Sequence, residues 1–293
     1  MKQQQPLPRR LLTLIVHAQD LTHQSKRVAI SRALTATNAP PLDFLQLRST
    51  KSDDTTLDAL LDAKRCLHEI LLANPVTAST PGAHDVHSNN NVARKQPALI
   101  VNAPLDDIAA LTRRKDGCGE SLDGWHVKER DLFRDDLQQM IHRAKARSGD
   151  EPTTIVGCSV HSVAAAVHAA RLGVDYIQVG TMFSTPSHPE KASVDQLEGP
   201  ELLQAILSEG RSLRSDEFSL PPLIAVGGIS TPQQIRQVVS AGASGVAVIR
   251  GILAADDARV TAAQYRAVLD EDLQCSMSQQ NYVTGDGPMN QPR

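Results

Sequence analysis

The last third of the chain contains two short apolar runs that end in glycine. Leu223 to Ser230 reads LIAVGGIS, and Gly245 to Ile252 reads GVAVIRGI. Runs of this length, rich in β-branched residues, are typical of parallel strands that are buried on both faces. Between them, Thr231 and Pro232 suit the N-cap and first turn of a helix, and Gly242 suits its end. The segment is therefore predicted to form a strand–helix–strand unit.

The same alternation recurs along the rest of the chain. Further strands are predicted at LLTLIVHA from Leu11, FLQLRS from Phe44, ALIVN from Ala98, GWHVKE from Gly124, TIVGCSV from Thr154 and YIQVGT from Tyr176. The other predicted helices run over Asp20 to Thr35, Thr55 to Leu72, Asp106 to Arg114, Asp131 to Arg147, Ser162 to Leu172, Gly199 to Ser208 and Asp256 to Leu273. Eight alternations in 293 residues predict a single closed (β/α)8 TIM barrel, which needs about 250 residues. An open doubly wound sheet is the alternative, and the lack of a G-x-G-x-x-G motif after any strand weighs against it.

The predicted barrel occupies residues 11–275, after an N-terminal extension at 1–10 and before a polar tail at 276–293. Residues 74–97 are polar and punctuated by proline and glycine. We interpret them as a flexible insertion between the second helix and the third strand, on the barrel face away from the chemistry.

Composition limits the partners. The chain is 41% hydrophobic and 22% charged, with a net charge of −3, as expected of an ordinary globular protein. Scattered Lys and Arg and only 3% aromatic residues argue against nucleic-acid binding. No apolar run reaches the roughly 20 residues that span a bilayer. We expect a cytoplasmic protein with a small-molecule ligand; a homo-oligomer stays open, since barrels of this kind frequently associate.

A phosphate site is predicted at the ends of the last two strands. Gly227 and Gly228 leave backbone N–H groups accessible to a ligand, and Ile249 and Arg250 follow the next strand. The double glycine has little other evident use at a strand end. The Arg250 side chain is expected to add positive charge.

Polar residues follow most of the other predicted strands as well. They are Gln46, Arg48, Asn102, His126, Lys128, Glu129, Ser159 and His161, and the loop after the sixth strand adds Thr181, Thr185, Ser187, His188 and Lys191. Because the loops after barrel strands build the active face, these side chains are expected to converge on one mouth.

Several segments of the chain resemble those of a known protein family. FLQLRS, VNAPLDDIA, GWHVKERDL, SVHSVAAAVHAARLGVDYIQVGTMFSTPSHP, AVGGIS and GVAVIRGI resemble segments of the thiamine phosphate synthase/TenI family of (β/α)8 barrels. The resemblance runs from about Leu11 to Asp257 and implies one of two activities. Synthases join a pyrimidine pyrophosphate to a thiazole phosphate with Mg²⁺, whereas TenI-type tautomerases move a proton on a thiazole carboxylate phosphate without a cofactor.

The synthase pattern is only partly matched. Gln46, Arg48 and Asn102 agree with it, and Asp131 falls at a metal carboxylate. Thr50 stands at a lysine position, with Lys51 displaced by one residue; Ala103 replaces a metal-binding aspartate, Lys128 and Glu129 replace Gly-Gln, and His188 replaces the lysine of the sixth loop. Lost carboxylate and lysine groups weigh against expulsion of pyrophosphate.

The resemblance therefore favours a TenI-like enzyme in which His161 is the general acid and base. Three alternatives stay open: a divergent Mg²⁺-dependent synthase using Asp131 and a pyrimidine pyrophosphate, a non-catalytic phosphate-binding regulator, and a His161 that merely caps the fifth helix together with Ser159 or Ser162. Lys128 and Glu129 are expected either to pair with each other or to grip a substrate carboxylate. Gln46, Arg48, Asn102, Ser159, Thr185, Ser187 and His188 complete the predicted substrate site.

Overall fold

The computed structural model describes residues 10–35, 41–49, 56–74, 96–113, 123–146, 154–191, 193–213 and 218–282, with side chains described up to residue 271 except that of Val194. Its strands are β1 (Leu11–His17), β2 (Phe44–Arg48), β3 (Ala98–Asn102), β4 (Gly124–Val127), β5 (Ile155–Val160), β6 (Tyr176–Val179), β7 (Leu223–Val226) and β8 (Gly245–Val248). Each strand pairs in parallel with the next, and β8 pairs with β1, which closes the barrel. The predicted (β/α)8 architecture is confirmed.

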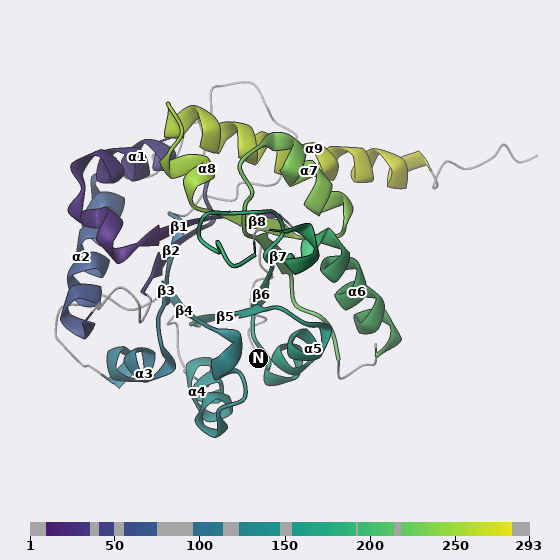
Figure 1. The fold of residues 1–293 in the computed structure, drawn as a ribbon, viewed down its shortest axis with the longest axis horizontal. Helices are drawn as coiled ribbons and strands as arrows, with labels where there is room; N and C mark the ends of the chain where they lie inside the picture. Colours follow the sequence, from purple (N-terminus) through teal and green to yellow (C-terminus); the bar gives the residue numbers. More distant parts are fainter. Residues whose placement is uncertain are drawn as a thin grey trace, which may run out of the picture.

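Helices form a layer outside the ring of strands (Figure 1). They are α1 (Gln24–Leu34), α2 (Leu57–Ala73), α3 (Leu105–Arg113), α4 (Asp135–Lys145), α5 (Val163–Leu172), α6 (Gly199–Ser212), α7 (Pro232–Ser240), α8 (Arg250–Leu253) and α9 (Ala258–Tyr282). Short 3-10 turns lie at η1 (Ala18–Thr22), η3 (Glu129–Asp131) and η4 (Val194–Gln196). None of the helices within the described ranges has the length and apolar character needed to cross a bilayer.

The ends of α7 and α5 are marked by capping residues. Thr231 caps α7 by accepting a hydrogen bond from the Gln234 N–H at 3.2 Å, and Pro232 takes the first turn. Ser162 caps α5 in the same way, and Gly173 ends that helix in the left-handed conformation. These are the preferred residues for such positions, since they satisfy backbone groups that the helix leaves unpaired.

Several predicted boundaries differ from the structure. The first predicted helix is two elements, η1 and α1, because the chain makes a tight turn right after β1. Arg250 and Gly251, which lie within the predicted strand run Gly245 to Ile252, instead begin the short helix α8. The helix α9 continues to Tyr282, into the range predicted as tail. Residues 75–95 of the predicted insertion lie outside the described residues.

Strand periodicity separates two apolar cores. Alternate side chains such as Leu12 and Leu14 point outward and pack under the helices, whereas Leu11 and Ile15 point into the barrel with Phe44 and Tyr176. Toward the carboxyl ends of the strands, the inward positions become polar. The floor of a pocket is therefore built from alternate residues of the strands.

Candidate active site

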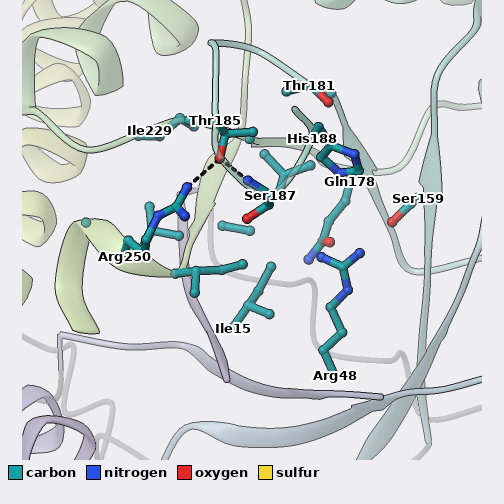
Figure 2. Close-up of a pocket in the computed structure, with 18 of the residues that line it drawn as sticks. Ile15, Arg48, Ser159, Gln178, Thr181, Thr185, Ser187, His188, Ile229 and Arg250 are labelled. Atoms are coloured by element: carbon teal, nitrogen blue, oxygen red, sulfur yellow. Dashed lines mark hydrogen bonds between the residues drawn. The ribbon is translucent and has the colours of Figure 1, made fainter. Parts of the chain in front are cut away.

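A pocket of about 350 Å³ opens at the carboxyl ends of the strands (Figure 2). It is lined by almost all the residues predicted for the site: Gln46, Arg48, Asn102, Lys128, Glu129, Ser159, His161, Thr185, Ser187, His188, Gly227, Gly228, Ile249 and Arg250. Asp131 is not among the lining residues. Since Ile15 of β1 also lines the pocket, the tertiary structure brings residues from all eight strands and the loops after them to one mouth.

Strand register sets the polar floor. Arg48 pairs with Asn102, and Asn102 pairs with His126 on the next strand. Ser159 pairs with Gln178 across β5 and β6. Gln178 was not predicted as a site residue, yet it lines the pocket with only 2% of its surface exposed, and its side-chain nitrogen has no hydrogen-bond partner. Its place two residues after the start of β6 could have marked it as inward-facing.

The double glycine has a packing role that the sequence interpretation underestimated. Gly227 and Gly228 have φ angles of 99° and 70°, in the region that favours glycine. A Cβ atom at Gly228 would lie 2.3 Å from the Phe183 carbonyl oxygen. The turn after β7 is thus pressed against the loop after β6, so these glycines are required for packing whether or not a phosphate binds.

The short helix α8 faces this turn. Ile249 is its N-cap residue, and the first N–H groups of a helix have no partner inside it. The Arg250 guanidinium donates to Thr185 Oγ1 at 2.7 Å, and that oxygen also accepts the Ser187 N–H at 3.4 Å (Figure 2). One rim of the pocket therefore combines backbone donors with a cation, which suits an anion.

His161 lies in the loop after β5, at the pocket rim, with 45% of its side chain exposed. Its backbone N–H donates to Glu129 Oε2 at 2.5 Å, and its Nδ1 lies 3.1 Å from Glu198 Oε1. Ser162 is the N-cap residue of α5, so the capping predicted for Ser162 is confirmed, whereas His161 itself does not cap the helix. Glu129 fixes the backbone of the loop that carries the imidazole.

Glu198 is a residue that the sequence analysis missed. It precedes α6, and its carboxylate accepts the Thr181 N–H at 2.5 Å, pairs with Lys191 and contacts His161. Burial would raise the pKa of Glu198, but the hydrogen bonds from Lys191 and Thr181 hold it below its ordinary value. An ionised Glu198 accepts a hydrogen bond from Nδ1–H of His161, which leaves a lone pair on Nε2. No strand-end pattern marks Glu198, because a long loop carries it.

The metal-binding alternative fits these residues poorly. Asp131 is buried in η3 with one carboxylate oxygen that has no hydrogen-bond partner, but it lies outside the pocket lining. Ala103, at the position of a second carboxylate, is fully buried. Among the residues that the structure describes, no three acidic, His or Cys side chains gather closely enough to hold a metal. Mg²⁺ sites use one or two carboxylates beside substrate phosphates, and among the described residues Glu129 is the single carboxylate that lines this pocket.

A closed (β/α)8 barrel with a polar pocket at the carboxyl ends of its strands defines the class of TIM-barrel enzymes. Residues 89–252 match the family described as thiamine monophosphate synthase. The chain belongs to this family, as the sequence resemblance predicted.

Curated proteins of similar sequence carry the name thiamine-phosphate synthase. The chain is 31% identical over 171 residues to a thiamine-phosphate synthase of Chloroflexus aurantiacus, covering 58% of this chain and 64% of the relative. It is 37% identical over 166 residues to one of Listeria welshimeri, covering 56% and 65%. The chain thus spans less than two thirds of these relatives.

A solved thiamine phosphate pyrophosphorylase from Pyrococcus furiosus shares the fold, with a TM-score of 0.57, 19% identity, and coverage of 90% of this chain and 98% of that one. A 3-hexulose-6-phosphate synthase has a TM-score of 0.53 at 15% identity, covering 88% and 99%. At these identities the likeness concerns the barrel alone.

Proposed function

We propose that this protein is an enzyme of thiamine biosynthesis that acts on a thiazole phosphate, and that it is a TenI-like tautomerase. The observation that carries this proposal is the pairing of His161 with Glu198 at the pocket rim, with 3.1 Å between Nδ1 and the carboxylate. When the Glu198 carboxylate accepts a hydrogen bond from Nδ1–H of His161, the imidazole Nε2 can take up and return a proton. Proton transfer needs this pair and a phosphate grip, and no metal.

The proposed phosphate grip lines the same pocket as His161. The Gly227–Gly228 turn, the start of α8 and the Arg250 guanidinium supply donors to an anion there. A substrate held by its phosphate at that rim would extend its ring toward His161. One C–H bond would then break and another form within the conjugated system, so that the ring becomes aromatic with no change in composition.

A synthase is the second candidate, because the matched relatives carry that name. Such a reaction must neutralise a departing pyrophosphate. His188 Nδ1 lies 2.8 Å from Glu190 Oε1, and the Lys191 ammonium group pairs with Glu198, so both side chains of this loop already face a carboxylate. The pocket therefore suits proton transfer better than expulsion of pyrophosphate.

Two assays test the proposal. The protein would be given the thiazole carboxylate phosphate tautomer, and turnover compared between wild type, His161→Ala and the control His142→Ala on the exposed face of α4. Loss of a general base costs roughly 10²–10⁴-fold in kcat, whereas the control should match wild type. The second assay supplies thiazole phosphate and pyrimidine pyrophosphate with and without Mg²⁺.

The outcomes separate the candidates. Turnover of the tautomer that falls in His161→Ala supports the proposal, while equal rates in that variant remove His161 from the mechanism. Metal-dependent formation of thiamine phosphate without tautomer turnover would overturn the tautomerase assignment. Binding of the phosphate compounds without either reaction would identify a non-catalytic binding protein.

A further inference from the structure

A continuous chain of hydrogen bonds runs beneath the pocket floor. Asn102 Nδ2 donates to Gln46 Oε1 at 3.3 Å, and Gln46 Nε2 donates to the Tyr176 hydroxyl at 3.3 Å. The Tyr176 hydroxyl lies 3.0 Å from His126 Nδ1, and His126 Nε2 lies 2.8 Å from Ser159 Oγ. Gln46, Asn102 and Ser159 line the pocket, whereas Tyr176 and His126 are fully buried below it.

Packing fixes the position of the Tyr176 ring. A Cβ atom at Gly157 would come within 2.1 Å of the Tyr176 ring, so the ring fills the space left by that glycine. Gly157 pairs with His126 in the β4–β5 register, which sets the imidazole beside the phenol. The Phe44 ring packs against Tyr176 with centroids 5.3 Å apart. The hydroxyl is therefore held where it can reach both Gln46 and His126.

The donor and acceptor in each of these hydrogen bonds follow from the number of protons that each group carries. A tyrosine hydroxyl has a single proton to donate, and its oxygen already accepts from Gln46. The acceptor that the structure gives for the phenolic proton is His126 Nδ1. A neutral imidazole then carries its proton on Nε2 and donates it to Ser159 Oγ. Burial, with added repulsion from Arg48 and Lys128, lowers the pKa of His126 to about 3, which keeps the ring neutral near pH 7.

We propose that His126 is a positioning residue: Tyr176 holds it in the Nε2–H tautomer, so that Ser159 accepts from His126 and turns its own hydroxyl proton into the pocket. Ser159 is thereby fixed as a donor to an acceptor atom of the substrate, such as a carboxylate or phosphate oxygen or a ring nitrogen. The role of Ser159 rests on the proposed function, because the pocket must hold the substrate. The tautomer of His126 does not depend on the proposed function.

The first experiment examines the tautomer directly. Long-range 1H–15N correlation spectra of the full-length protein, labelled on histidine, distinguish protonated from unprotonated ring nitrogens. For His126, assigned by its absence in His126→Gln, we expect a neutral ring with the proton on Nε2 from neutral pH down to mildly acidic pH. In Tyr176→Phe, the signals should move toward a mixture of tautomers. A wild-type ring protonated on Nδ1, or on both nitrogens, would overturn the proposal.

The second experiment is a double-mutant cycle on the tautomerase reaction. Tyr176→Phe and Ser159→Ala should each lower kcat about tenfold, the size of one lost hydrogen bond, with a smaller effect on KM. The double variant should be no slower than Ser159→Ala alone, because the tyrosine acts through the serine. Multiplication of the two effects, to about a hundredfold, would contradict the relay.

Matched variants separate this role from simple packing. His126→Gln retains a donor near the Nε2 position and should keep more activity than His126→Leu. Thr13→Val removes a fully buried hydroxyl that has no hydrogen-bond partner and should leave kcat unchanged. If the spectra show the Nε2–H tautomer but no turnover occurs, the proposed function fails and the relay stands. If the enzyme is active but His126 carries the other tautomer, the relay fails alone.

Discussion

Glu198 shows how a single side chain can organise a site without touching the pocket itself. Its carboxylate joins the backbone of Thr181 after β6, the ammonium group of Lys191 in the following loop, and the imidazole of His161 after β5. These three groups come from separate segments. The ammonium charge and the donated hydrogen bonds favour the ionised form of the Glu198 carboxylate. The position of the proposed base therefore depends on a residue from a neighbouring loop.

Glu198 also makes stability depend on pH. Its folded-state pKa lies below the ordinary 4.5, so its ionised form stabilises the fold at pH values above 4.5, and this contribution is lost as pH falls through the lowered pKa. Glu198→Gln should therefore lower the free energy of unfolding at pH 7 by about 1 kcal/mol or less, since the group is partly solvated. The gap between wild type and variant should shrink in denaturant titrations below pH 4.5.

The control for this prediction is Glu201→Gln, at an exposed position in the first turn of α6, the helix that follows Glu198. It should leave the unfolding free energy nearly unchanged at both pH values. A Glu198→Gln difference that grows in acid would show that the sign assigned to Glu198 is wrong.

At the level of elements, a repeated device fastens the strands at the barrel face opposite the pocket. An aspartate directly before each of β2, β4 and β6 accepts the N–H of the second residue of the preceding strand. The pairs are Asp43 with Leu12 at 2.7 Å, Asp123 with Leu99 at 2.8 Å and Asp175 with Val156 at 2.7 Å. Because these N–H groups lie at the start of a strand, the carboxylates replace partners that the ladder does not supply. This face stabilises the barrel, and the opposite face is left for chemistry.

Asp175 offers the clearest test of this device, since it also pairs with Lys145 of α4. Asp175→Ala removes the acceptor of the Val156 N–H and should lower the free energy of unfolding by about 1–3 kcal/mol. Asp175→Asn keeps a carbonyl acceptor but loses the ion pair, so it should cost less. Urea titrations of both variants would measure the difference. Equal losses would mean that the ion pair, and not the strand contact, carries the stabilisation.

For the whole molecule, closure of the barrel depends on contacts between the two ends of the sequence. β1 pairs with β8, and α9 packs across α1 and α7 beside this seam (Figure 1). The Arg266 guanidinium of α9 donates to the Arg10 carbonyl at 3.2 Å and to Asp43 at 3.0 Å. One side chain thus ties the last helix to the start of the first strand and to the residue before the second.

Arg266→Leu should therefore destabilise the molecule by about 1–3 kcal/mol, because two half-buried acceptors lose their donor. The matched control is Arg236→Leu on α7, whose pair with Glu271 is more than half exposed and should be worth at most about 1 kcal/mol. Unfolding by urea, followed by circular dichroism, compares the two. Similar losses in both variants would show that Arg266 does not hold the seam.

Much of this arrangement could be predicted from the sequence. The eight apolar runs mark all the strands, since each is short, apolar and followed by a helical segment. Thr231 and Ser162 mark the starts of α7 and α5 through ordinary capping chemistry. The short helix α8 could not be predicted, because four residues carry too little periodicity. Glu198 and Tyr176 were missed as functional groups because only contacts with distant residues give them a role.

The order of strands and helices can be predicted from the amino-acid residues alone. The two-residue period of a strand also predicts which side chains face the barrel interior. Which of those side chains meet depends on the tertiary fold. His161 and Glu198, or Tyr176, His126 and Ser159, come together because ring closure and strand register bring distant segments within hydrogen-bond distance. Periodicity is a local property of the backbone, whereas such contacts depend on how the whole ring packs.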